Sequence, residues 1–276
     1  MTRIGIIGGG NIGEALLSGI LGDGADPKSI IVADPTTERL EQLKDQYDVV
    51  TTEDSAEAAD GSDFVFIAVK PDIVPIALQD ITDTVDSNGD ETVVVSLAAG
   101  VTNKAMESVL PAGTPVVRVM PNTPMLVGKG ASALAGGRFA EKNHVEAVQD
   151  LMSATGTVVI VKEKDIDAVT AISGSGPAYY FMVTEAMIDA GVNLGLPRVL
   201  AEQLAVATAE GAATMMAKGQ SEDGGDDPVT LRTKVSSPGG TTSAATRTLD
   251  EEGLRTAFYR AMQACKDRSI ELGKSD

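Results

Sequence analysis

Short apolar runs alternate with segments of helical spacing along the first half of the chain. The runs that predict strands are Arg3–Gly8, Ile30–Ala33, Phe64–Val69, Val93–Leu97 and Val116–Met120. Runs that are apolar at nearly every position are typical of strands buried on both faces. This alternation predicts an α/β domain with a doubly wound parallel sheet, covered by helices on both sides.

Helical spacing continues alone from about Lys164, where the strand pattern stops. The predicted helices are Pro177–Leu194, Pro197–Lys218, Ser243–Glu251 and Leu254–Leu272. The second is rich in Ala and Met, which favour close helix packing, so we expect a subunit or packing interface there and not a ligand site. The chain is therefore expected to divide into an α/β domain, residues 1–163, and an all-α domain, residues 164–276.

A glycine fingerprint joins the first strand to the first helix. Gly8, Gly10 and Gly13 have the spacing G-x-G-x-x-G, directly after a strand and at the start of a helical segment. In this context the first glycine permits a tight turn, the second lets a pyrophosphate approach, and the third allows close helix–strand packing. The pattern predicts a site for NAD(P) or FAD.

The end of the second strand bears on cofactor choice. Asp34 lies there, 21 residues after Gly13. A carboxylate at this position usually binds the adenosine ribose and repels a 2′-phosphate, which favours NAD. Thr36, Thr37 and Arg39 follow at once and are candidates to receive that phosphate. The choice between NADPH and NADH therefore stays open.

Further candidates follow later strands. Lys70–Pro71 and Ala98–Gly100 come directly after strands, at the edge of an open α/β sheet where ligands bind. Pro121–Pro124, which includes Asn122, has the same placement and is expected to face the reactive end of the cofactor. Each of these segments taken alone is equally typical of a plain surface loop.

Two segments rich in Gly, Ser and Pro precede helices in the second half. Val235–Thr242 holds two glycines, a proline and four hydroxyl residues before the helix predicted from Ser243. Such backbone can gather N–H groups around an anion, to which the helix N-terminus adds partial positive charge. Ser173–Pro177 resembles it, with Ser175 and Gly176 expected to cap a helix that begins at Pro177. Each segment also fits an ordinary helix start, but two in one region favour a site for a small carboxylate substrate.

The amino-acid composition argues against several kinds of binding partner. A net charge of −18, from 40 acidic and 22 basic residues, argues against nucleic acid. No apolar run approaches the ~18 residues that span a membrane, and no signal peptide is expected. One cysteine and one histidine, Cys265 and His144, argue against a disulfide and a zinc site, so we expect no metal and a reducing cytoplasm. The acidic charge with only 3% aromatic residues resembles cytoplasmic proteins of salt-loving organisms.

No His, Cys or Lys of the second half stands out as an acid–base catalyst. Many hydride transfers to a carbonyl need a positioned proton donor, whereas a protonated imine needs little beyond hydride delivery. Loops rich in hydroxyl groups that can seat an anion suit a small cyclic imino acid.

The same segments, taken in order, resemble the pyrroline-5-carboxylate reductases, which carry out the last step of proline synthesis. The resemblance spans nearly the whole chain, and the block Ser236–Thr242 is its most specific part. The matching segments are Gly8–Ala15, Ala68–Pro71, Ala98–Thr102, Met120–Pro124, Ser173–Tyr179, Gly195–Arg198 and Ser236–Thr242.

The resemblance implies an N-terminal Rossmann domain and a C-terminal helical dimerisation domain, NADPH or NADH as cofactor, and a homodimer, with a larger homo-oligomer left open. It implies that Ser237, Gly239, Gly240, Thr241 and Thr242 seat the substrate, with the Thr242 hydroxyl closest to the ring nitrogen as the catalytic group. It places Glu163 and Ser175 near the same pocket. The residues implied to line the cofactor are Gly8, Gly10, Asn11, Ile12, Ser55, Val69, Lys70, Ala98 and Ala99, beside the candidates Gly13, Asp34, Thr36, Pro71 and Asn122 from the spacing. Asp34 departs from the short hydroxyl residue that the family often has there.

Two other interpretations remain. A β-hydroxyacid dehydrogenase or a general imine reductase has a related build, but the hydroxyacid enzymes use a lysine of their interdomain helix as proton donor. Ser175–Val192 contains no lysine, which counts against them. A catalytically silent NAD(P) sensor is the second, and the intact segment Ser237–Thr242 counts against it.

Overall fold

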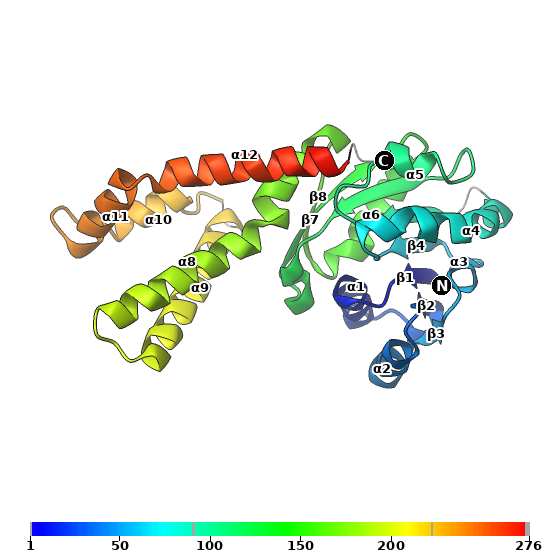
Figure 1. Ribbon diagram of the computed structural model, residues 1–276, viewed down its shortest axis with the longest axis horizontal. Coiled ribbons are helices and arrows are strands. Elements are labelled where there is room, and N and C mark those ends of the chain that lie inside the picture. Colours follow the sequence, from blue (N-terminus) through cyan, green and yellow to red (C-terminus); the bar gives the residue numbers. More distant parts are fainter. Residues whose placement is uncertain (1, 90–91, 222, 274–276) are drawn as a thin grey trace. The chain divides into compact units, whose positions relative to one another are not determined.

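The computed structural model describes residues 2–89, 92–221 and 223–273 (Figure 1). The chain forms two compact units: unit 1 is Met1–Ser175 with Ala264–Asp276, and unit 2 is Gly176–Gln263. The division between residues 163 and 164 that the sequence suggests, into an NAD(P)-binding domain and a helical substrate-binding and dimerisation domain, stays a prediction.

Unit 1 is built on an eight-stranded sheet in the order β3-β2-β1-β4-β5-β6-β7-β8. Its strands are β1 (Ile4–Ile7), β2 (Ile30–Ala33), β3 (Val50–Thr52), β4 (Phe64–Ile67), β5 (Val93–Ser96), β6 (Val116–Met120), β7 (Gly130–Gly136) and β8 (Gly156–Ile160). The first six strands are parallel, and β7 pairs antiparallel to β6 and parallel to β8. The order reverses beside β1, where open α/β sheets bind ligands.

Within the described part of unit 1, seven complete α-helices accompany this sheet, besides the end of a helix that begins in unit 2. They are α1 (Asn11–Gly22), α2 (Thr37–Tyr47), α3 (Ser55–Ala59), α4 (Val74–Asn88), α5 (Asn103–Glu107), α6 (Lys142–Ser153) and α7 (Ile166–Val169). Short 3₁₀ turns lie at Pro27–Ser29, Pro71–Ile73, Thr123–Val127 and Glu163–Asp165.

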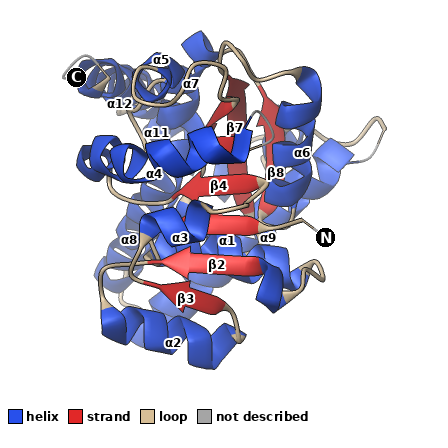
Figure 2. Cartoon of the chain, turned by 90° about the vertical axis from the view of Figure 1, so that its right-hand side faces the viewer, coloured by secondary structure: helices blue, strands red, loops and turns tan. Residues whose placement is uncertain are grey.

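Alternate residues of the central strands enter two separate cores. Ile4 and Ile6 of β1 pack with α1, α2 and α6 on one face of the sheet. Ile7 of β1, and Val65 and Ile67 of β4, pack with α3, α4 and α5 on the other face, where Figure 2 shows α3 and α4 lying over the strands. Successive side chains of a strand point to opposite sides of the sheet, so each strand contributes to both cores, and the helices on each face bury these side chains. The expected helix-covered, mainly parallel sheet is confirmed.

Three strands were not expected from the sequence: β3, β7 and β8. β3 has only three residues, and β7 is made almost entirely of Gly, Ala and Ser, which have low strand propensity. β7 forms because β6 supplies an open edge and the Gly130 N–H donates to Thr155 O (2.8 Å), which starts the pairing with β8. Tertiary pairing therefore overrides local preference here.

In the described part of unit 2, all regular secondary structure is helical. Its helices are α8 (Gly176–Asn193), α9 (Arg198–Ser221), α10 (Pro228–Lys234), α11 (Thr241–Glu251) and most of α12 (Leu254–Leu272), which continues into unit 1 after Gln263. α8 and α9 pack along each other as a hairpin. Gly195 follows the end of α8 and has a left-handed backbone (φ 98°). Its N–H donates to Val192 O (2.9 Å), which closes the last turn of the helix. α10 was not expected from the sequence.

Large apolar side chains of α8 are open to solvent. Tyr180, Phe181 and Met182 are 62%, 67% and 72% exposed, and only Gly176 of this helix is buried. A helix that is apolar on most sides and exposed is typical of a protein interface. The subunit or packing interface that the sequence suggests for α9 is therefore expected to include α8 as well.

The segment Ser173–Pro177 differs from the expectation. It is not a loop before a helix, because the chain is already helical from Ile166, with a π-helical turn at Thr170–Gly174. The N–H of Ser175 donates to Thr170 O (2.8 Å), five residues back. The Ser175 N–H is therefore not free to bind an anion, and a role of this segment in substrate binding stays a prediction. π-Turns within helices are frequent at functional sites.

None of the described helices combines the length and the apolar composition that crossing a membrane requires.

Candidate active site

The loop between β1 and α1 has the geometry of a pyrophosphate cradle. Gly8 has φ 104°, and a Cβ there would lie 2.8 Å from Ala68 O. A Cβ on Gly13 would collide with Gly8 O, whereas one on Gly10 would meet nothing within 4 Å. Gly8 and Gly13 are therefore required by the chain itself, and Gly10 keeps an exposed space that a ligand can enter. These are the three roles that a dinucleotide site gives its glycines, so the residues fit such a cofactor.

Side chains from β2 and α2 hold the peptide groups of Gly9 from both directions. Its N–H donates to Asp34 Oδ2 (2.9 Å), and its carbonyl accepts from Arg39 Nε (2.6 Å). Asp34 Oδ1 also accepts the N–H of Thr36 (3.0 Å). The loop is thus fixed before any cofactor arrives.

Arg39 is in turn held by an acid of α1. Its Nη2 donates to Glu14 Oε2, and the hydroxyl of Tyr47 donates to the other oxygen, Oε1 (3.0 Å). The hydrogen bond from Arg39 holds the pKa of Glu14 below its ordinary value. Burial, and then the hydrogen bond to Glu14, raise the pKa of Tyr47. Arg39 was expected from the sequence as a phosphate ligand, but Glu14 and Tyr47 were missed, because Glu14 lies on α1 whereas Arg39 and Tyr47 lie on α2.

The remaining cofactor candidates lie where the parallel strands end. Val69 Cγ1 approaches the position of a Gly8 Cβ to 3.0 Å. Lys70 and Pro71 are exposed after β4, Ala98 is buried and Ala99 half-buried after β5, and Ser55 begins α3 after β3. Unit 1 therefore brings the cofactor candidates together on one edge of its sheet. Their contact with a cofactor stays a prediction.

Two candidates have structural partners in unit 1. Asn122 Oδ1 accepts the N–H of Ala131 (2.8 Å), and its Nδ2 donates to Ser173 O (3.0 Å). Glu163 Oε1 accepts the N–H of Asn103 (2.6 Å) at the start of α5. Both side chains support the loops that follow β5 and β6.

Arg118 is a buried charge that sequence analysis did not single out. Its side chain is 4% exposed, and its Nη1 and Nη2 lie 3.6 Å from Glu163 and 3.9 Å from Asp167. Ser269 of α12 donates to the same Asp167 (2.7 Å). Burial lowers the pKa of Arg118, and the two carboxylates oppose that shift. The sequence did contain a hint of this ion pair, because an arginine within the otherwise apolar strand V-V-R-V-M needs a buried partner for its charge.

Unit 2 contains the candidate substrate-binding loop, which leads into α11. Gly239 takes the left-handed conformation (φ 69°). Ser237 O closes the turn by accepting the N–H of Gly240 (3.0 Å) and the hydroxyl of Ser243 (2.6 Å). The loop is therefore held by its own hydrogen bonds.

The start of α11 has free hydrogen-bonding groups. The helix begins at Thr241, two residues before the predicted Ser243, and Gly240 is its N-cap without a side-chain cap bond. Within the described residues, the N–H groups of Thr241, Thr242 and Ser243 and the hydroxyls of Thr241 and Thr242 make no hydrogen bond. Unpaired N–H groups at a helix N-terminus attract anions.

Ser175 belongs to unit 1, where its hydroxyl lies 3.2 Å from Cys265 Sγ on α12. The structure thus groups Ser175 and Glu163 with the cofactor candidates, and Ser237–Thr242 in unit 2.

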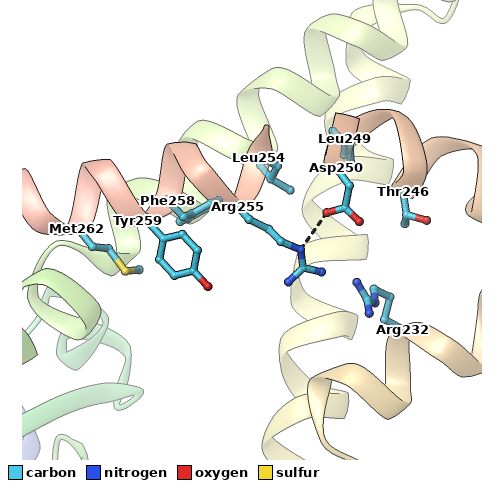
Figure 3. Close-up of a pocket in the computed structure, with 9 residues that line it drawn as sticks. All are labelled: Arg232, Thr246, Leu249, Asp250, Leu254, Arg255, Phe258, Tyr259 and Met262. Atoms are coloured by element: carbon cyan, nitrogen blue, oxygen red, sulfur yellow. Dashed lines mark hydrogen bonds and ion pairs between the residues drawn. The ribbon is translucent and has the colours of Figure 1, made fainter. Parts of the chain in front are cut away.

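A separate pocket of about 460 Å³ lies on unit 2 (Figure 3). Arg255 Nε is paired there with Asp250 (2.9 Å), and Phe258 meets Tyr179 edge to face at 6.1 Å. Thr246, in its wall, donates to Thr242 O (3.0 Å), so the pocket adjoins the loop through α11. Among the described residues, no group of His, Cys, Asp or Glu side chains is placed to hold a metal ion.

A preformed pyrophosphate cradle at the switch point of a parallel sheet, in a chain that also has a helical unit with an anion-attracting helix start, is typical of a dinucleotide-dependent oxidoreductase.

Comparisons with known proteins assign the family. Residues 163–272 match the family described as pyrroline-5-carboxylate reductase dimerisation, and residues 3–100 match NADP oxidoreductase coenzyme F420-dependent. The chain is 55% identical to the pyrroline-5-carboxylate reductase of Corynebacterium melassecola, over 99% of this chain and all of the relative. It is 45% identical to the Mycobacterium tuberculosis enzyme, over 99% and 97% of the two chains.

Solved structures agree. The Coxiella burnetii pyrroline-5-carboxylate reductase has a TM-score of 0.92 at 36% identity, with 99% of each chain covered. A Plasmodium falciparum pyrroline carboxylate reductase with NADP bound has a TM-score of 0.85 at 29% identity, covering 99% and 98%. The chain belongs to the pyrroline-5-carboxylate reductase family.

Proposed function

We propose that the protein reduces 1-pyrroline-5-carboxylate to L-proline with NADH or NADPH, as the last step of proline biosynthesis. The observation that supports this best is the start of α11, where three free N–H groups and the Thr242 hydroxyl meet. A small substrate with one carboxylate and one ring nitrogen matches those groups.

The substrate carboxylate is seated by the backbone of the loop and helix start, which are Ser237, Gly239, Gly240, Thr241 and Thr242. The helix dipole and the free N–H groups supply the attraction, so no arginine is needed. The Thr242 hydroxyl accepts the N–H of the protonated imine and fixes the ring. Glu163 and Ser175, which belong to unit 1, are the two further residues that we assign to substrate binding.

The reduced nicotinamide, when bound, supplies a hydride to the imine carbon. The C=N pair of electrons moves onto nitrogen, so the charged imine becomes a secondary amine. No general acid is required for this step, because the nitrogen already carries its proton. The Thr242 hydroxyl stays hydrogen-bonded to that nitrogen while its charge falls.

The cofactor is held by the cradle and strand ends of unit 1. Gly8–Gly13 surround the pyrophosphate, and Asp34 and Thr36 lie at the adenosine ribose. Lys70 and Ala99 border the path toward the nicotinamide. The full set that we assign is Gly8, Gly10, Asn11, Ile12, Gly13, Asp34, Thr36, Ser55, Val69, Lys70, Pro71, Ala98, Ala99 and Asn122.

The protein forms a homo-oligomer through its dimerisation region. We propose that the basic assembly is a homodimer that covers the exposed apolar side chains of α8 and α9, and that dimers can join into a larger homo-oligomer. We further propose a cytoplasmic protein whose acidic surface, with net charge −18, keeps it dispersed at high salt.

A spectrophotometric assay tests the proposal. Purified protein in high salt should oxidise NADH or NADPH when 1-pyrroline-5-carboxylate is added, and proline should accumulate in equal amount. Binding of either cofactor without oxidation would instead support the sensor interpretation. Turnover of a β-hydroxyacid without turnover of the imine would support the dehydrogenase interpretation.

A further inference from the structure

Arg39, a cation that contacts the glycine loop, is already paired with an acid. Arg39 contacts the loop with Nε on the Gly9 carbonyl and directs Nη2 at Glu14. The side chains of Arg39 and Glu14 are only 24% and 23% exposed, so the pair is shielded on most sides. A guanidinium in this state has less freedom to bind a further anion.

The surroundings of the predicted ribose position are acidic. Asp34 directly follows β2, and both its oxygens accept backbone N–H groups, which fixes the carboxylate in place. The hydroxyl of Thr37, a candidate phosphate ligand, donates to Glu53 (2.7 Å). The negative charge of Asp34 would therefore repel a phosphate on the ribose. The two candidate phosphate ligands already have acidic partners, Glu53 for Thr37 and Glu14 for Arg39.

We infer that Glu14 is a positioning residue for cofactor choice: it withholds Arg39 from the 2′-phosphate of NADPH, so that the chain binds NADH more tightly. The inference rests on the proposed use of a nicotinamide dinucleotide. The choice between NADH and NADPH then depends on two acids, Glu14 on α1 and Asp34 after β2.

A purely structural role for Glu14 makes a different prediction. If the pair with Arg39 only stiffened the loop, its loss would weaken both cofactors alike, because both have the same pyrophosphate. If Glu14 withholds Arg39, its loss should favour the 2′-phosphate alone. The ratio of the two dissociation constants separates the cases.

The experiment is isothermal titration calorimetry of the full-length protein with NADH and with NADPH, without substrate and at one fixed ionic strength. Glu14→Gln removes the charge and keeps the size of the side chain. The double variant Glu14→Gln/Arg39→Gln also removes the released cation. Tyr47→Phe is the matched control, because it removes the other hydrogen bond of Glu14 and leaves the pair with Arg39.

The wild-type protein should bind NADH more tightly than NADPH. Glu14→Gln should tighten NADPH relative to NADH by about 5- to 30-fold, the range given by one charge-assisted hydrogen bond at a part-exposed site. The double variant should return the ratio to the wild-type value, and Tyr47→Phe should leave it unchanged.

An equal change for both cofactors in Glu14→Gln would overturn the inference, and so would tighter binding of NADPH by the wild type. Either result would leave the reductase proposal standing. Failure of the wild type to bind either dinucleotide would instead overturn the proposed function and this inference with it.

Discussion

Replacement of Thr242 by Ala should impair catalysis and leave folding intact. The Thr242 hydroxyl makes no hydrogen bond within the described residues, so its removal leaves no buried group unpaired. The substitution also keeps the backbone N–H at the start of α11, which is proposed to seat the carboxylate. The loss should therefore be confined to the ring nitrogen.

A hydrogen bond to a charged group contributes about 1.5–3 kcal/mol, so kcat/KM of Thr242→Ala should fall roughly 10- to 150-fold. Thr242→Ser keeps the hydroxyl and should stay within about threefold of the wild type. The melting temperature of both variants should match that of the wild type, since surface changes of this kind alter stability by no more than about 0.5 kcal/mol. The assay is initial-rate oxidation of the reduced cofactor over a range of imine concentrations.

Two other threonines of α11 provide comparisons. Thr248 donates to the carbonyl of Ala244 (3.2 Å) along the same helix, so Thr248→Ala should leave the rate unchanged. Thr241 is exposed and is the first residue of α11, after the N-cap Gly240, and its hydroxyl makes no hydrogen bond within the described residues. Thr241→Ala should therefore cost little stability and little rate. Equal kinetic losses at Thr241 and Thr242 would show that the hydroxyl is assigned to the wrong residue, and full activity of Thr242→Ala would refute its role.

Three further predictions concern unit 1. Gly10→Ala should weaken dinucleotide binding in calorimetry by at least about tenfold with an unchanged melting temperature, because the added methyl meets no atom of the chain but fills the space left for the pyrophosphate. Arg118→Met should lower the free energy of unfolding in urea by about 1–3 kcal/mol, since two partly buried carboxylates lose their partner, whereas Lys142→Met on the surface should change it by less than about 0.5 kcal/mol. Glu14 has a pKa depressed in the folded state, so its stabilising contribution is present above its ordinary value of 4.5 and is lost as the pH falls through the lower, folded value. The free energy of unfolding, measured in urea at several acid pH values, should accordingly depend less steeply on pH in Glu14→Gln than in the wild type. The same slope in both proteins would contradict the pairing with Arg39.

The strand pattern and the glycine fingerprint could be predicted because their signals are local. β2 and β6 have the predicted bounds, and the two ends of α12 also agree. Each of these segments has enough apolar residues at the right spacing to fix its type. The family resemblance was likewise visible, because its motifs are short and stand in a fixed order.

Non-local pairing could not be predicted in the same way. Arg39 and Glu14 are 25 positions apart on different helices, so the sequence could not show that the expected phosphate ligand is already paired. The Gly and Ser residues of Ser173–Pro177 suggested a loop, yet helical turns lie on both sides of Ser175, whose N–H donates to Thr170 O. β7 depends on the open edge of β6.

The measurement that tests the account most directly follows a deuterium atom. The protein is supplied with 1-pyrroline-5-carboxylate and with NADH deuterated at the transferring position of the nicotinamide, and the proline formed is examined by mass spectrometry and NMR. The account predicts one deuterium per molecule of L-proline, on the ring carbon that was the imine carbon. Cofactor binding without proline formation, or proline without deuterium at that carbon, would contradict it.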